Sequence, residues 1–146
     1  MKKELSSKTI EIIKSTGGIV VANAPEISIK MFEILFSRYP DIEKLFAFQS
    51  RDQYMVLAES LSNFIVNIEK IDKLTPALDT IAVVHVEHNI YPEHYPLVGM
   101  ALMSAMEDIL KDTATLKFVD AWREAYKYLS DILIEMEEKM YKEIKN

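Results

Sequence analysis

The stretch that decides the fold is residues 75–99, which read TPALDTIAVVHVEHNIYPEHYPLVG. Thr75-Pro76 is typical of a helix start, because proline is well tolerated in the first helical turn. Apolar residues upstream of His85 recur at the 3-4 spacing that places side chains on one face of a helix. Pro92 then opens another helix. The stretch predicts two consecutive helices, the first of which has a histidine on its apolar face.

Outward from this stretch, the whole chain reads as α-helical, with prolines and glycines as punctuation. The Gly17-Gly18 pair ends the first expected helix, and Asn23 and Glu26 fit a capping-box pattern at the start of the second. Pro40 ends the second helix and starts a short helical turn. We therefore predict an all-α fold of about seven helices, over residues 7–16, 23–39, 41–46, 53–68, 75–88, 92–110 and 115–142.

Composition excludes several classes of protein. The chain has 146 residues, a length typical of one domain, so we expect a single domain over 1–146. Its net charge of −6 offers no basic face for nucleic acid. Three glycines are too few for a phosphate-binding loop, and without cysteine there is no disulfide or thiolate metal site. No run is long and apolar enough for membrane insertion, and the polar start does not fit a secretory signal. We expect a cytoplasmic protein.

The three histidines fall within ten residues. His88 and His94 read as surface or helix-end residues. His85 and His88 also have an i, i+3 spacing that could hold a transition metal. On its apolar face, His85 is either a buried core histidine or a neutral imidazole that offers Nε2 to a metal. In the second case its Nδ1–H needs an orienting partner.

Two segments, IAVVH at 81–85 and PEHYPLVG at 92–99, resemble the haem-binding segment of bacterial globins. The chain is similar to the haem domain of flavohaemoglobins and to their single-domain relatives. The resemblance implies a globin fold, a three-on-three helical sandwich around haem b, with His85 as the protein ligand of the iron. Further matching pieces follow in the family's order at 39–46, 67–69, 120–126 and 137–141.

The resemblance also assigns roles on the side of the haem that carries His85, the proximal side. Tyr95 and Glu137 match two residues that form a network with the proximal histidine, and such a network strengthens the donation of the imidazole to iron. Phe46 matches an aromatic residue that contacts the haem, and Val98 falls among the haem-contacting positions. Without the resemblance, Tyr95 reads as an ordinary core tyrosine and Glu137 as a solvated glutamate.

On the opposite, distal side, where gas ligands bind, the sequence departs from the family. Phe32 stands where flavohaemoglobins usually have a tyrosine that contacts bound oxygen. Gln53 and Leu57 match the usual distal glutamine and leucine. Gln53 has a second reading, because it also forms a capping box with Ser50, whose backbone its amide can bond instead of a ligand. Val84 stands where relatives often have a lysine, so no partner for the haem propionates is identified.

The resemblance implies a haem protein that reversibly binds O2, NO and CO at a five-coordinate ferrous iron. Its extension is nitric oxide dioxygenase activity, which converts NO to nitrate. The sequence ends where flavohaemoglobins continue into a reductase, so this turnover requires a separate electron-donating reductase. The alternative is a haem-based gas sensor or interaction protein that works through a partner chain. We expect a monomer or a homodimer.

Overall fold

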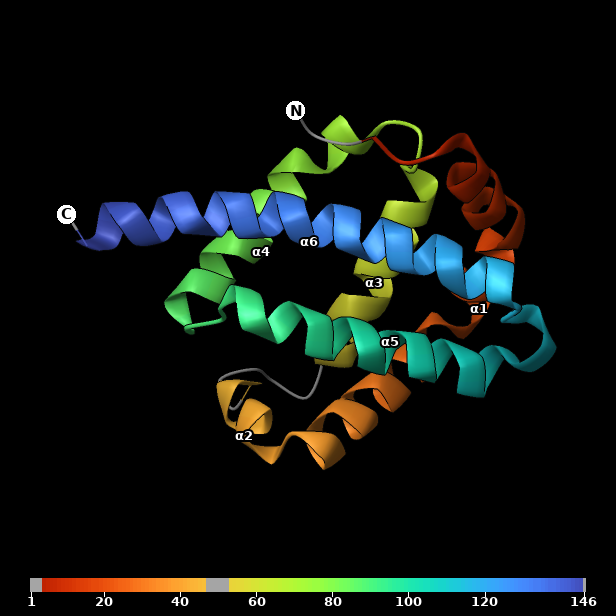
Figure 1. The fold of residues 1–146 in the computed structure, drawn as a ribbon, viewed down its shortest axis with the longest axis horizontal. Coiled ribbons are helices and arrows are strands. Elements are labelled where there is room, and N and C mark those ends of the chain that lie inside the picture. Colours follow the sequence, from red (N-terminus) through yellow and green to blue (C-terminus); the bar gives the residue numbers. More distant parts are fainter. Residues whose placement is uncertain (1–3, 47–52, 146) are drawn as a thin grey trace.

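The computed structural model describes residues 4–46 and 53–145. Within these ranges the chain forms six α-helices joined by turns and short 3-10 helices (Figure 1), which confirms the predicted all-α class. The 3-10 helices cover Lys44–Phe46, Ile71–Leu74, Pro92–His94 and Lys111–Thr113. The α-helices are α1 Ser7–Arg38, α2 Pro40–Glu43, α3 Gln53–Val66, α4 Thr75–Glu87, α5 Tyr95–Leu110 and α6 Leu116–Lys145.

The expected break near Gly17-Gly18 is wrong, because α1 runs through both glycines and through Pro25. A side chain at Gly17 would place its Cβ 2.7 Å from Cγ2 of Ile65 in α3, so this glycine permits a close approach of two helices. Asn23 does not start a new helix, since its amide donates to the carbonyl of Ile19 within α1. The two expected N-terminal helices are therefore one.

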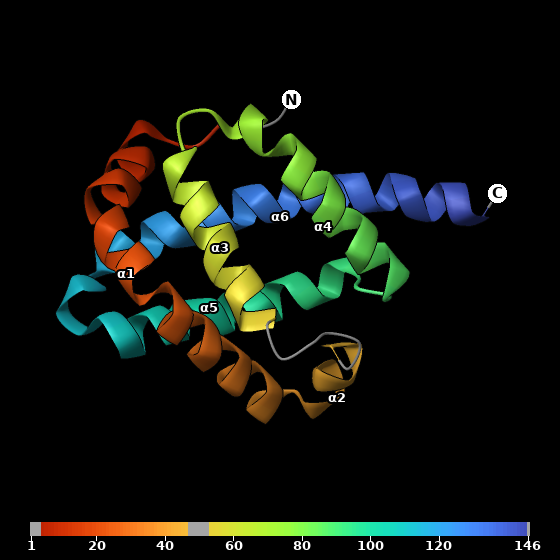
Figure 2. The ribbon, with the colours of Figure 1, turned by 180° about the vertical axis from the view of Figure 1, so that it is seen from behind.

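The helices form two crossing layers. Figures 1 and 2 show α5 and α6 alongside one another, with α3 and α4 crossing them on one face. Helix α1 packs on α3, α5 and α6, and α4 packs on α6. The core fills the space between the layers with large side chains from four helices, among them Ile27, Met31, Phe64, Met106, Phe118 and Trp122.

Helix α6 reaches from one end of the molecule to the other (Figure 1). The Thr115 hydroxyl accepts a hydrogen bond from the Phe118 amide at 3.3 Å and so satisfies a free N–H at the start of the helix. One face of α6 is apolar and buried, and the other bears exposed charges such as Lys127 and Asp131, whose side chains pair. Among the described helices, none combines the length and the apolar character that a membrane crossing requires.

Candidate functional site

The turn after α4 determines which residues meet His85. The amide of Ile90 donates to the His85 carbonyl at 2.9 Å, and Asn89 adopts a left-handed conformation with φ 61°. Asparagine tolerates this conformation better than most residues. The chain thereby reverses, and α5 begins with Tyr95, whose ring centroid lies 6.0 Å from that of His85. His94 stands at the helix end, where its Nδ1 accepts from the Tyr91 amide at 2.9 Å.

Three side chains from three helices meet at one point. Nδ1 of His85 lies 3.0 Å from Oε2 of Glu137 and 3.0 Å from the hydroxyl oxygen of Tyr95. The Tyr95 hydroxyl donates to the same Oε2 at 2.7 Å. With Glu137 as carboxylate, only acceptor lone pairs face the imidazole, so the ring proton belongs on Nδ1. We call His85, Tyr95 and Glu137 the proximal triad.

The triad differs from a surface hydrogen-bond network in its burial. Glu137 is only 2% exposed, although it lies in a helix end rich in charge. Burial, followed by the hydrogen bond with Glu137, raises the pKa of Tyr95 far above its ordinary value of 10.0. The phenol therefore stays protonated and donates across the whole physiological pH range.

The donor set of the triad fits a metal-bound imidazole. Nδ1 is occupied by Tyr95 and Glu137, which leaves Nε2 as the ring atom with a free lone pair. Among the described residues, no hydrogen bond reaches Nε2. Oε1 of Glu137 is buried and has no partner in the same part of the chain. A buried carboxylate with one unpaired oxygen is costly, and a metal ion at Nε2 would offset that cost, because it would draw electron density from the neutral imidazole and strengthen the hydrogen bond from Nδ1–H.

Two further tyrosines support the triad, and the sequence reasoning missed both contacts. The Tyr126 hydroxyl donates to the backbone carbonyl of Tyr95 at 2.7 Å. The Tyr141 hydroxyl donates to the Ile90 carbonyl at 2.9 Å, and its ring stacks on Tyr91 with centroids 5.2 Å apart. The available signal was spacing, since residues separated by eleven positions, as Tyr126 and Glu137 are, share a helix face.

The remaining predicted residues lie outside the hydrogen bonds of the triad. Phe32, Leu57 and Val98 are half-buried on α1, α3 and α5, and each packs against the core. Phe46 ends a 3-10 helix and Gln53 begins α3, but both side chains, and the Ser50 cap, lie outside the described part. The Phe32 ring lies 5.5 Å from that of Phe36, centroid to centroid.

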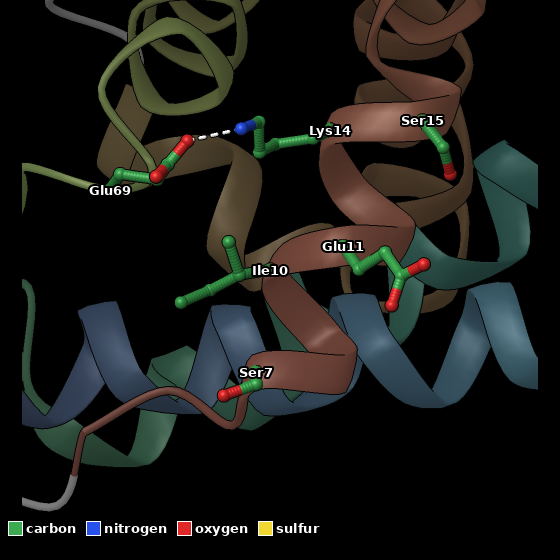
Figure 3. Close-up of a pocket in the computed structure, with 6 residues that line it drawn as sticks. All are labelled: Ser7, Ile10, Glu11, Lys14, Ser15 and Glu69. Atoms are coloured by element: carbon green, nitrogen blue, oxygen red, sulfur yellow. Dashed lines mark hydrogen bonds and ion pairs between the residues drawn. The ribbon is translucent and has the colours of Figure 1, made fainter.

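Beyond the triad, the described structure offers a surface groove that none of the predicted site residues lines, and no cluster of metal ligands. In the described ranges, no group of three or more histidine and carboxylate side chains is arranged to hold a bare metal ion. A surface groove of about 430 Å³ lies between the start of α1 and the segment after α3. Figure 3 shows Lys14 of α1 paired with Glu69 at this groove. None of the predicted site residues lines it.

Comparison with known proteins now defines the class. The profile of the globin family matches residues 29–133, so the chain belongs to the globin family. The globin fold predicted above is thereby confirmed, because solved globins superpose on nearly the whole chain. A globin from Campylobacter jejuni gives a TM-score of 0.86 at 27% identity and covers 94% of this chain and 99% of its own.

Within the globin family, the chain is similar to bacterial globin-like proteins and flavohemoproteins. An uncharacterised globin-like protein of Aquifex aeolicus is 40% identical over 137 residues, 94% of this chain and 97% of its own length. A flavohemoprotein of Oceanobacillus iheyensis is 36% identical over 146 residues; the match covers 97% of this chain but only 36% of that protein. An engineered carbene transferase from Rhodothermus marinus gives a TM-score of 0.94 at 27% identity, over 97% of this chain and 99% of that one.

Proposed function

We propose that this globin binds haem b through Nε2 of His85 and reversibly takes up O2, NO or CO. The observation that carries the proposal is the proximal triad, a buried carboxylate and a phenol that together occupy Nδ1 of His85. Globin family membership supports the cofactor, because related flavohemoproteins match nearly the whole chain.

Each member of the triad has a distinct task in this proposal. Glu137 accepts the Nδ1–H hydrogen bond, orients the ring and increases electron density on Nε2. Tyr95 donates to the same carboxylate oxygen and holds it in place. The bound haem would supply an iron centre for diatomic ligands and one-electron chemistry. Phe32, Leu57 and Val98 would supply apolar contacts to the haem. The family resemblance gives Phe46 a further apolar contact and Gln53 the role of distal polar group, and the side chains of both lie outside the described part.

A second function, nitric oxide dioxygenase activity, is favoured by the relatives. The matching flavohemoproteins are longer proteins, and the Rhodothermus neighbour derives from a protein assigned as a nitric oxide dioxygenase. The reaction would draw its electrons from a reductase outside the globin domain. Phe32 argues for slower turnover, because it offers no hydrogen bond to the gas ligand. The alternative is a gas sensor that works through a partner chain, as a monomer or homodimer in the cytoplasm.

Haem titration of the purified protein tests the proposal. An intense Soret band that saturates at one equivalent of haem, and that shifts when CO is added to the reduced protein, is the expected result. A protein that stays colourless after haem is supplied would contradict it. The two functions separate in a second assay, in which NO is added to the reduced, oxygenated protein. Stoichiometric nitrate with recovery by a supplied reductant supports the dioxygenase; haem loading without nitrate favours the sensor.

A further inference from the structure

Tyr95 is held from two sides by one helix. Tyr126 and Glu137 are eleven residues apart on α6, and three turns of helix bring them to the same face. The Tyr126 hydroxyl donates a hydrogen bond to the backbone carbonyl of Tyr95, and Glu137 accepts one from the Tyr95 hydroxyl. The position of the Tyr95 side chain relative to His85 therefore depends on how closely α5 and α6 approach each other.

A glycine of α5 lies directly against the Tyr126 ring of α6. Gly99 is buried one turn after Tyr95 on α5, so the two residues share a face. A Cβ at Gly99 would lie 2.6 Å from Cε2 and 2.9 Å from Cδ2 of Tyr126. Both are atoms of a rigid ring whose hydroxyl is already engaged with Tyr95. A methyl group at position 99 cannot be accommodated unless the ring moves.

The ring has space to move into. Gly99 and Tyr126 both line a surface groove of about 320 Å³ between α5 and α6, together with Met103 and Arg123. A ring displaced toward this groove would carry its hydroxyl away from the Tyr95 carbonyl. A side chain at Gly99 would therefore weaken the hydrogen bond by which Tyr126 supports Tyr95.

We infer that Gly99 is a positioning residue: its missing side chain seats Tyr126 against Tyr95 and so fixes the hydrogen-bond geometry at Nδ1 of His85. The inference rests on the proposed function only where iron is the readout. The geometry itself can be measured in the haem-free protein, because the ¹⁵N chemical shift of His85 Nδ1 responds to the strength of its hydrogen bonds.

Two other glycines provide matched controls. A Cβ at Gly17 would meet Ile65 at 2.7 Å, nearly as close a contact, but at the α1–α3 crossing. A Cβ at Gly18 would meet nothing within 4 Å. Gly17→Ala therefore reports crowding without a link to the triad, and Gly18→Ala reports the effect of alanine in a helix alone.

The experiment compares these variants by His85 ¹⁵N NMR without haem and by the iron–histidine stretching frequency of the ferrous protein with haem. Gly99→Ala should shift the Nδ1 resonance and lower the frequency, in the direction of Glu137→Gln. Gly17→Ala should lower the melting temperature yet leave both signals unchanged, and Gly18→Ala should change neither signal. The inference fails if Gly99→Ala keeps both wild-type signals, or if Gly17→Ala moves them equally.

Tyr126→Phe decides the matter if Gly99→Ala does not fold. This variant keeps the ring but loses the hydroxyl, so the Nδ1 resonance of His85 should shift in the same direction as in Glu137→Gln. An unchanged resonance would overturn the inference. Where both variants fold, the double variant should shift no further than Gly99→Ala alone, because both changes remove the same contact. Failure of the wild-type protein to bind haem would refute the proposed function. The Nδ1 measurement on the haem-free protein would still test whether Gly99 positions Tyr126.

Discussion

The proximal triad of His85, Tyr95 and Glu137 and the aromatic pair of Phe32 and Phe36 hold their side chains in place by different interactions. The triad joins α4, α5 and α6 through three hydrogen bonds around a buried carboxylate. Phe32 lies on α1, half-buried against the core, with its ring 5.5 Å from that of Phe36. One region is thus specified by polar geometry and the other by packing.

The two kinds of contact would influence a bound haem in different ways. Hydrogen bonds to a buried charge are among the stronger ones, and loss of one partner leaves the charge unpaired. An aromatic pair contributes about 0.5–1.5 kcal/mol beyond its buried area and supplies no donor. Changes in the triad should therefore alter the iron through His85, whereas changes at Phe32 should alter the gas ligand.

The largest expected effect comes from removal of the proposed iron ligand. His85→Ala should reduce haem affinity by more than about 100-fold, because loss of a residue that only orients a ligand already costs 10- to 100-fold. His88→Ala, three residues further along the chain, is the matched control and should keep wild-type affinity. Haem transfer to an acceptor globin measures both. Equal losses would instead indicate that the two histidines act as a metal-binding pair.

A smaller effect is expected where the apolar region is given a donor. Phe32→Tyr should slow oxygen release by roughly five- to thirty-fold, the equivalent of one hydrogen bond of about 1–2 kcal/mol. Carbon monoxide release should change less, because that ligand is less polar when bound. Stopped-flow displacement measures the two rates. A similar change for both gases would mean a steric effect and would remove Phe32 from the distal side.

Alkaline pH should lower the stability of the protein through the triad, because Tyr95 is a titratable group, whereas Phe32 and Phe36 have no group that titrates. Since the folded-state pKa of Tyr95 is raised above its unfolded value of about 10, the unfolded chain loses this proton first. Stability is then complete below about pH 10 and falls above it, by up to about 1.4 kcal/mol per pH unit for this group. Tyr95→Phe should lower stability at neutral pH but flatten the alkaline decline. Urea unfolding at several pH values measures the slope, and an equally steep decline in the variant would contradict the assignment.

The sequence predicted the helical class and most helix bounds because prolines and apolar spacing are local signals. It failed at Gly17-Gly18 because the role of Gly17 depends on Ile65, which lies far along the chain. Glycine near a helix end and glycine at a helix crossing look alike in one sequence. The crossing, once observed, explains why α1 continues through the pair.

The site shows the same limit. Apolar spacing placed His85 on an apolar helix face, but only the family resemblance joined it to Glu137, fifty-two residues later. Read alone, Glu137 was a solvated glutamate, and its 2% exposure contradicts that reading. The supporting contact of Tyr126 was missed because it ends on a backbone carbonyl, which no residue identity reveals.

The influence of the proximal triad on iron can be measured most directly as the iron–histidine stretching frequency of the ferrous, haem-loaded protein. The wild type should show such a band, and Glu137→Gln should lower its frequency, since this change keeps the side-chain shape but removes the charge that polarises His85. Glu138→Gln, an exposed neighbour on the same helix, should leave the frequency unchanged. A frequency in Glu137→Gln equal to that of the wild type would contradict the claim that the buried carboxylate acts on iron through His85.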